Sequence, residues 1–224
     1  MPLQILPNIL KMLPADSQAR ILEASHDIRL SSKREITADG LARGPSLFLR
    51  EGLLFEAVSK TAPVTLVLKP GEFVSRTLVL TMNGPSTGAR FEVAVPVQLT
   101  AFNREVLHEE VLKSPLVADL VLGSLLRSGD YRRMMLSSMA IESVDIRILR
   151  LLWYVGEMNT EGIRLAPSLS NVAIARCVGA SREEVTRKLK GLFRTGLITE
   201  QGEHYVLPPS TGFILENSDV PPLD

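Results

Sequence analysis

The stretch Leu169 to Ile198 reads LSNVAIARCVGASREEVTRKLKGLFRTGLI and decides how the C-terminal part of the chain folds. Its first half places apolar residues at helical spacings up to Val178 and stops at Gly179, which readily takes the left-handed conformation that ends a helix. Ser181 can cap a second helix, and Glu184 stands where a reciprocal capping box needs it. The stretch therefore predicts two short helices joined by a tight turn.

The second helix is expected to start at Arg182 and to end at Thr195-Gly196. One of its faces is apolar and the other is charged, as in a helix that packs on one side only. Helix, three-residue turn and helix form the DNA-binding helix-turn-helix unit, and the apolar ends of segment 197–207 around a polar turn predict a two-stranded wing. The inner face consists of Val185, Leu189, Leu192 and Phe193, and the outer face of Arg182, Glu183, Thr186, Arg187 and Lys190.

Charge is distributed unevenly along the chain. The segment from Arg176 to Gly196 holds six Lys or Arg against two Glu, a local net charge of +4, whereas the whole chain has a formal net charge of zero. Such asymmetry is expected where a protein meets phosphate groups. The alternative is an ordinary helical hairpin whose charged residues form a solvated face.

On Ser181, Arg182, Glu183 and Arg187 the stretch resembles the Crp/Fnr family of bacterial transcription regulators, and within it the cyclic AMP receptor protein subgroup. The resemblance implies that Arg182 and Arg187 contact bases in the major groove and that Glu183 accepts a hydrogen bond from a cytosine amino group. The half-site would be of the GTGA type, which agrees with the preference of arginine for guanine and of carboxylates for cytosine. Ser181 and Thr186 are further DNA-binding candidates, and phosphate contacts are expected from Ser170, Lys188, Lys190 and Arg194.

Composition narrows the classes of protein that fit. The 224 residues are 45% hydrophobic and 22% charged, enough for a substantial core divided over two modest domains. The sequence contains no apolar run long enough to cross a bilayer and no secretion segment, so a cytoplasmic protein is expected. The single cysteine, Cys177, permits no intrachain disulfide or iron–sulfur cluster, and a buried thiol is the favoured interpretation over a redox switch. His26, His108 and His204 are too dispersed for a metal or haem site, and no catalytic motif is present, so neither a metal nor an enzyme is expected.

Short extended runs separated by turn residues fill the region between His26 and Ala101. This spacing is typical of an antiparallel β-roll and resembles the N-terminal sensor of the same family, with 69–73 at its glycine turn. Cyclic-nucleotide binders place a second glycine and a glutamate after that turn, but residues 74–78 read VSRTL, and Arg76 and Arg90 lack a glycine-rich cradle. We therefore expect neither cyclic AMP nor another cofactor to bind there. The expected extended runs are 28–30, 46–50, 53–58, 64–68, 72–80 and 91–99.

A long helix is predicted from Ser114 to Ser143, with a face that alternates steps of four and three residues. By its resemblance to the family, this helix is expected to form the dimer interface. The alternative is a helix buried against its own β-roll. The contact candidates are Leu122, Leu125, Leu136 and Met139.

The sequence thus predicts an α+β fold with an antiparallel β-roll over 1–113, a dimerisation helix over 114–142, a winged helix-turn-helix over 143–208 and a flexible tail over 209–224. The predicted function is a homodimeric transcription regulator that binds double-stranded DNA at an inverted repeat and has no membrane partner. RNA polymerase and an unidentified small-molecule effector are further candidate partners. The alternative is a small-ligand sensor whose winged helix serves protein interaction.

Overall fold

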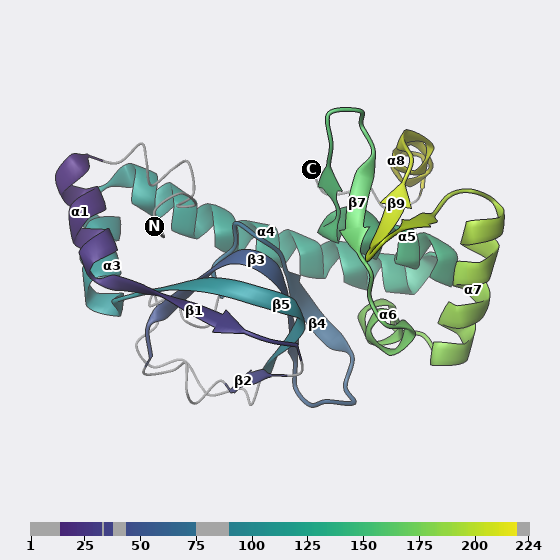
Figure 1. Ribbon diagram of the computed structural model, residues 1–224, viewed down its shortest axis with the longest axis horizontal. Coiled ribbons are helices and arrows are strands. Elements are labelled where there is room, and N and C mark those ends of the chain that lie inside the picture. The colour runs from purple at the N-terminus through teal and green to yellow at the C-terminus, as the bar shows by residue number, and fades with distance from the viewer. Residues whose placement is uncertain (1–13, 33, 38–43, 75–89, 219–224) are drawn as a thin grey trace. The chain divides into compact units, whose positions relative to one another are not determined.

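The computed structural model describes residues 14–32, 34–37, 44–74 and 90–218 (Figure 1). Two compact units make up the chain, residues 1–59 with 68–129 and residues 60–67 with 130–224. The boundary between them falls inside one long helix, α4 (Pro115–Ile141). Among the described helices, none is long and apolar enough to span a membrane.

The N-terminal unit is built on an antiparallel sheet whose central strand is β5 (Arg90–Phe102). β5 pairs with β1 (Ser25–Leu30), β2 (Glu35–Thr37) and β3 (Ser46–Ala57), with Ile28 opposite Leu99 in one register. The two runs predicted at 46–50 and 53–58 form the single strand β3, and that at 64–68 is β4 (Val64–Leu68). Most of the run predicted at 72–80 lies outside the described residues.

Gly52 explains why β3 is one bent strand. Its φ is 84°, and the pairing register with β5 shifts on both sides of it. A Cβ atom at this position would lie 2.1 Å from the carbonyl oxygen of Pro96 on the neighbouring strand. Only glycine fits, because it combines positive φ with the close approach of two backbones.

Aromatic side chains from the sheet and its following turn form the core of this unit. Phe73 lies edge-on to Phe48 at a ring distance of 5.1 Å and 6.1 Å from Phe102. Helices α1 (Ala15–Glu23), α3 (Arg104–Lys113) and the first half of α4 close over this cluster. Their buried contributions are Ile21, Leu107, Val117 and Val121.

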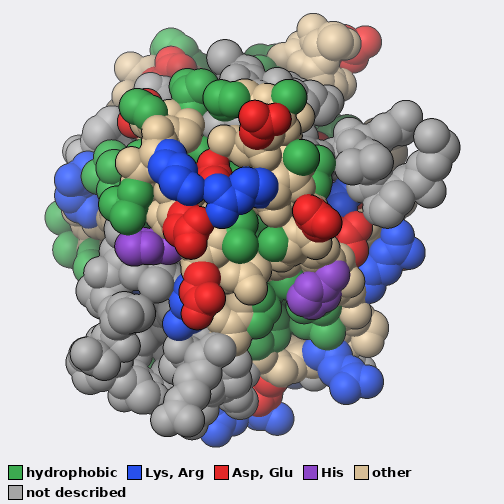
Figure 2. All heavy atoms as spheres, turned by 90° about the vertical axis from the view of Figure 1, so that its left-hand side faces the viewer, with side chains coloured by type: hydrophobic (Ala, Val, Ile, Leu, Met, Phe, Trp, Pro, Cys, Tyr) green, Lys and Arg blue, Asp and Glu red, His purple; other side chains and the backbone are tan. Residues whose placement is uncertain are grey.

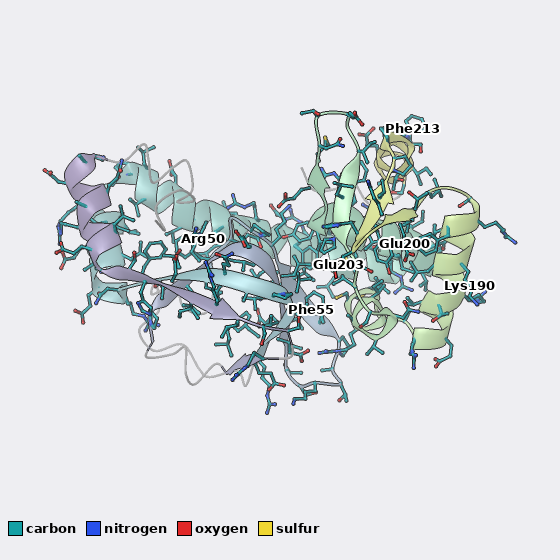
Figure 3. All side chains as sticks on the ribbon, viewed as in Figure 1. Arg50, Phe55, Lys190, Glu200, Glu203 and Phe213 are labelled. Carbon is teal, nitrogen blue, oxygen red and sulfur yellow. The ribbon has the colours of Figure 1, made fainter. Side chains whose placement is uncertain are left out.

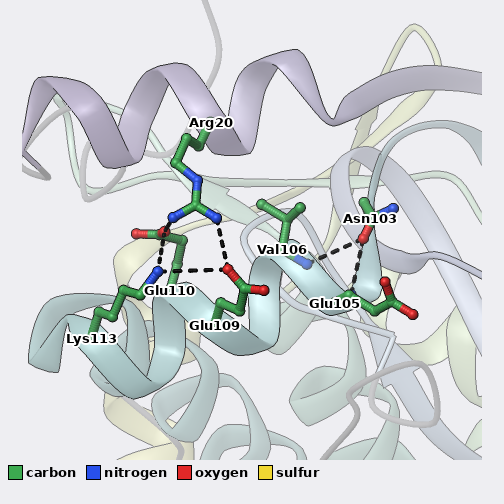
Figure 4. A network of polar contacts seen from close by, with 7 residues as sticks. All are labelled: Arg20, Asn103, Glu105, Val106, Glu109, Glu110 and Lys113. Atoms are coloured by element: carbon green, nitrogen blue, oxygen red, sulfur yellow. Dashed lines mark hydrogen bonds and ion pairs between the residues drawn. The ribbon is translucent and has the colours of Figure 1, made fainter.

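Ion pairs join α1 to α3 on the outside of the same core (Figure 4). Arg20 contacts Glu109 at 2.7 Å and Glu110 at 2.9 Å, and its hydrogen bond holds the pKa of the Glu109 carboxyl below the ordinary value. Figure 2 shows acidic and basic side chains interleaved across this end of the molecule. The mixture of signs makes this face a poor anion-binding surface.

The C-terminal unit contains the two predicted helices of the helix-turn-helix and a third helix that precedes them. α5 (Val144–Val155) packs against α6 (Asn171–Val178) and α7 (Arg182–Arg194). Beside them lies a four-stranded antiparallel sheet in the order β6-β7-β9-β8 (Figure 1). Its strands are β6 (Glu157–Met158), β7 (Arg164–Pro167), β8 (Thr199–Gln201) and β9 (His204–Leu207). The predicted α+β class is confirmed.

The prediction of a flexible tail from residue 209 onward is wrong for its first part. Residues Pro209–Glu216 form helix α8, and Thr211 Oγ1 donates to the Leu197 carbonyl oxygen at 3.0 Å. Gly212 lies so close to Trp153 that a Cβ atom there would be 2.7 Å from the indole ring. The helix forms because Pro209 suits a first helical position and Leu215 is buried one turn after Thr211. Residues 219–224 lie outside the described part of the chain.

Candidate DNA-binding site

Local backbone chemistry sets the two helices of the helix-turn-helix unit. Gly179 has φ 63° and ψ 46°, so it ends α6 in the left-handed conformation as predicted. Ser170 Oγ accepts from the Ala173 amide at 3.2 Å, and Ser181 Oγ accepts from the Glu184 amide at 3.1 Å. The hydroxyls of both serines therefore cap helices.

α5 fixes the other two helices through polar contacts that sequence reasoning missed. Arg147 Nη1 donates to the Val178 carbonyl oxygen at 2.6 Å, and Lys188 Nζ donates to Asp145 Oδ1 at 3.1 Å. Burial alone would raise the pKa of Asp145, but hydrogen bonds from Ser143 and Lys188 outweigh it, so the pKa lies below the ordinary value. The partners are 31 and 43 residues apart in the sequence, so local sequence patterns cannot predict either contact.

The outer face of α7 remains open. An open groove runs along it, lined by Arg182, Glu183, Thr186, Arg187, Lys190, Gly191 and Arg194. The four basic residues of this set and Glu183 are exposed, whereas Val185, Leu189 and Leu192 are buried on the opposite side. The structure thus brings the three predicted base-reading residues together on one surface. Arg187 lies 3.7 Å from Glu184, a contact between exposed side chains that DNA can displace at little cost.

Lys188 differs from the other predicted phosphate contacts. Its side chain is partly buried and is paired with Asp145, so it faces α5 rather than the groove. Thr186 is also engaged, because Asn171 Nδ2 donates to its hydroxyl oxygen. Lys190 and Arg194 are exposed on the groove side.

The predicted wing is present as β8 and β9 around Gly202, whose φ is 60°. Glu200 lies in β8 and Glu203 lies in the turn before β9; both are exposed, and both are labelled in Figure 3. The tip of this wing is therefore acidic, which disfavours contact with phosphate groups.

α4 exposes a stripe of large apolar residues. Leu122 is 48% exposed and Leu136 is 69% exposed, as a dimer contact requires. Leu125 and Met139 are instead partly buried within their own chain, Leu125 against the aromatic core, while Leu126 is 68% exposed. The exposed positions on this side of α4 are 122, 126, 129, 133 and 136. They include Leu122 and Leu136 of the predicted contact residues, but Leu126 takes the place of Leu125.

In the glycine turn of the N-terminal unit, residues 69–73, backbone groups are hydrogen-bonded to side chains of the same chain. Glu72 is 1% exposed, and its Oε2 accepts from the Lys69 amide at 3.0 Å. Ser124 Oγ accepts from the Phe73 amide at 2.8 Å, and Arg127 Nη2 lies 3.4 Å from the Gly71 carbonyl oxygen. Arg90 pairs with Glu35, while Arg76 lies outside the described residues. Across the residues that the structure covers, no group of three or more His, Cys, Asp or Glu is placed to hold a metal ion.

An exposed basic helix, a preceding helix and a β-wing define a winged helix-turn-helix DNA-binding protein. Residues 146–209 match the family model of the Crp-like helix-turn-helix domain. This part of the chain is therefore a Crp-like helix-turn-helix domain, and regulators of the Crp/Fnr family share the fold of the whole chain.

Solved structures share the fold at low sequence identity. The c-di-GMP responsive global regulator CLP of Xanthomonas campestris is 22% identical, with a TM-score of 0.60, over 87% of this chain and 99% of its own. A Crp/Fnr family transcriptional regulator from Thermus thermophilus is 19% identical, with a TM-score of 0.60, over 82% and 93%. A cyclic nucleotide-binding domain containing protein from Listeria monocytogenes is 15% identical, with a TM-score of 0.65, over 91% and 96%. A comparison with curated proteins gave no match.

Proposed function

We propose that this chain acts in the cytoplasm as a homodimer that binds an inverted-repeat operator with GTGA-like half-sites and needs no cyclic AMP. The observation that carries the proposal is the exposed outer face of α7, where Arg182, Glu183 and Arg187 line one groove. Each arginine can make two hydrogen bonds to a guanine, and the carboxylate can accept from a cytosine amino group.

A fixed scaffold makes these side chains selective. The buried residues of α7 and the Lys188–Asp145 contact hold the helix backbone, so the arginines have one docking orientation. Each good bidentate pair contributes roughly 1–3 kcal/mol of discrimination against the wrong base. Lys190 and Arg194 are the side chains best placed for phosphate contacts, which fix register without reading sequence.

Dimerisation is supported by the leucines that α4 leaves exposed. Leu122, Leu126 and Leu136 recur at steps that suit packing against an identical helix. A twofold dimer presents two recognition helices to successive major grooves about 34 Å apart, which requires an inverted repeat. RNA polymerase is the further protein partner we propose for the DNA-bound dimer.

Independence from cyclic AMP is supported by the occupied glycine turn. The Glu72 carboxylate turns back to its own turn, and Ser124 and Arg127 of α4 contact the turn backbone. A small-molecule effector, if one acts, would therefore bind by other contacts than these groups.

Fluorescence anisotropy of the ligand-free, full-length protein tests the proposal. A duplex carrying TGTGA and its inverted copy is compared with a scrambled duplex over a salt series, with and without cyclic AMP. We expect the wild-type protein to bind the operator duplex selectively without nucleotide. Arg182→Ala should weaken the free energy of operator binding by about 1–3 kcal/mol per half-site. Lys190→Ala is the matched control, because the loss of a phosphate contact should weaken binding to both duplexes alike.

Each contrary result has its own meaning. Equal loss on both duplexes for Arg182→Ala would remove that residue from base reading. Selectivity that develops only with cyclic AMP would contradict nucleotide independence. A folded dimer without salt-dependent DNA affinity would favour a sensor whose winged helix binds protein.

A further inference from the structure

Thr186 lies one turn beyond Arg182 on the outer face of α7 and lines the same groove. Its hydroxyl is engaged within the protein. Thr186 Oγ1 donates to the Arg182 carbonyl oxygen at 2.8 Å and accepts from Asn171 Nδ2, also at 2.8 Å. The side chain therefore meets DNA with its hydroxyl already bonded in two directions.

A threonine side chain has only a hydroxyl and a methyl group with which to contact a base. A hydroxyl has one hydrogen, and the Arg182 carbonyl takes it, so none is left for the acceptors of guanine, adenine or thymine. Two groups remain: one lone pair of the oxygen, which could only accept from a base amino group, and the methyl, which takes part in no hydrogen bond. In the major groove, the apolar feature that a methyl can contact is the C5-methyl of thymine.

We propose that Thr186 reads the C5-methyl group of a thymine in the half-site through its own methyl group. This inference rests on the proposed function, since it requires α7 to enter the major groove. A GTGA half-site contains one thymine and its complement contains another, so a thymine methyl is present on either strand.

The bonded hydroxyl also fixes which way the methyl points. Asn171 is the first residue of α6, directly after the cap Ser170, so its amide is held by a helix that packs against α7. A side chain held by α6 and by the α7 backbone keeps one orientation before DNA arrives. Contact with a base methyl then costs little rotamer entropy.

Replacement of individual thymines by deoxyuridine tests this directly, because it removes only the C5-methyl and leaves base pairing intact. Competition anisotropy with such duplexes should show about fourfold weaker binding per half-site at one thymine for the wild-type protein, the effect of one buried methyl-sized group. Thr186→Ser keeps the hydroxyl and should lose this sensitivity. Thr186→Val keeps a methyl and should retain it.

The outcomes separate this inference from the function on which it rests. A wild-type protein that fails to distinguish the operator from a scrambled duplex overturns both. A protein that selects the operator but binds thymine and deoxyuridine duplexes equally overturns the role of Thr186 alone. The same holds if Thr186→Ser remains as sensitive as the wild type, or if Thr186→Val becomes insensitive.

Discussion

Replacing Arg150 by alanine should destabilise the C-terminal unit by about 3–5 kcal/mol, the cost of breaking a buried ion pair by removing one partner. Arg150 on α5 and Glu142 at the end of α4 have side chains that are only 1% and 3% exposed. Two hydrogen bonds of 2.6 Å join the guanidinium to the two carboxylate oxygens. The truncation would leave Glu142 buried beside the Ser138 hydroxyl, without its cation.

A matched double variant separates the cost of an unpaired charge from the net worth of the pair. Glu142→Leu with Arg150→Met removes both charges and keeps apolar volume, so it should be near wild-type stability or above it. The truncation also removes the 2.5 Å bond from Arg150 Nη2 to Ser218 Oγ, which Ser218→Ala measures separately.

Urea unfolding followed by tryptophan fluorescence is the assay. The chain has one tryptophan, Trp153, which lies in α5 three residues after Arg150, so its emission reports on this unit. An Arg150→Ala protein within about 1 kcal/mol of the wild type at pH 7 would refute the reasoning, because a buried charge that loses its partner costs several times more.

The pH dependence of the same experiment has a defined sign. Burial alone would raise the pKa of Glu142, but hydrogen bonds from Arg150 and Ser138 outweigh it and hold the pKa below the ordinary value. The stabilising contribution is therefore complete above the unfolded-state pKa of about 4.3 and is lost as pH falls through the lower folded-state pKa. The wild type should lose more stability in this acidic range than the uncharged double variant, in which only other carboxyls with lowered pKa values, such as Asp145, still contribute.

Three further perturbations follow from exposed or strained positions. Leu136→Glu should shift the dimer toward monomer in sedimentation, whereas Leu112→Glu, at another exposed leucine, should not; equal behaviour of the two would count against the α4 interface. Glu200→Gln with Glu203→Gln should tighten binding to operator and scrambled duplexes alike in anisotropy, because it removes negative charge beside phosphates, and unchanged affinity would place the wing away from DNA. Gly179→Ala should cost about 1–2 kcal/mol by the same unfolding assay, since φ is 63° and alanine resists that region, whereas Gly179→Asn should cost less.

The helix-turn-helix unit could be predicted closely because its signals are local. Caps at Ser170 and Ser181 and the left-handed Gly179 depend on neighbours within a few residues, and α7 begins at the predicted Arg182. Lys188 was predicted to contact phosphate, and its pairing with Asp145 could not be foreseen for the opposite reason. Its charge fits a phosphate contact as well as an ion pair, and only the tertiary fold brings Asp145 near it.

Elsewhere the errors have separate physical causes. On α4 the structure exposes Leu126 rather than the predicted Leu125, because the two leucines are adjacent and a pattern of three and four residues accepts either one. The bulge at Gly52 made one strand look like two. Helix α8 was missed because it is only eight residues long and its apolar residues do not gather on one face, so contacts with Trp153 and Leu197 fix it.

The internal pairing of Lys188 and the carboxylates of the wing bear on how such a regulator searches a genome. Affinity for random DNA is almost entirely a matter of phosphate neutralisation and counterion release. Here one cation of α7 is paired with α5 and the wing carries two exposed carboxylates, so we expect this background affinity to be low. A large excess of non-target sites then sequesters fewer molecules, and occupancy of the operator depends more on base contacts than on the ionic strength of the cell.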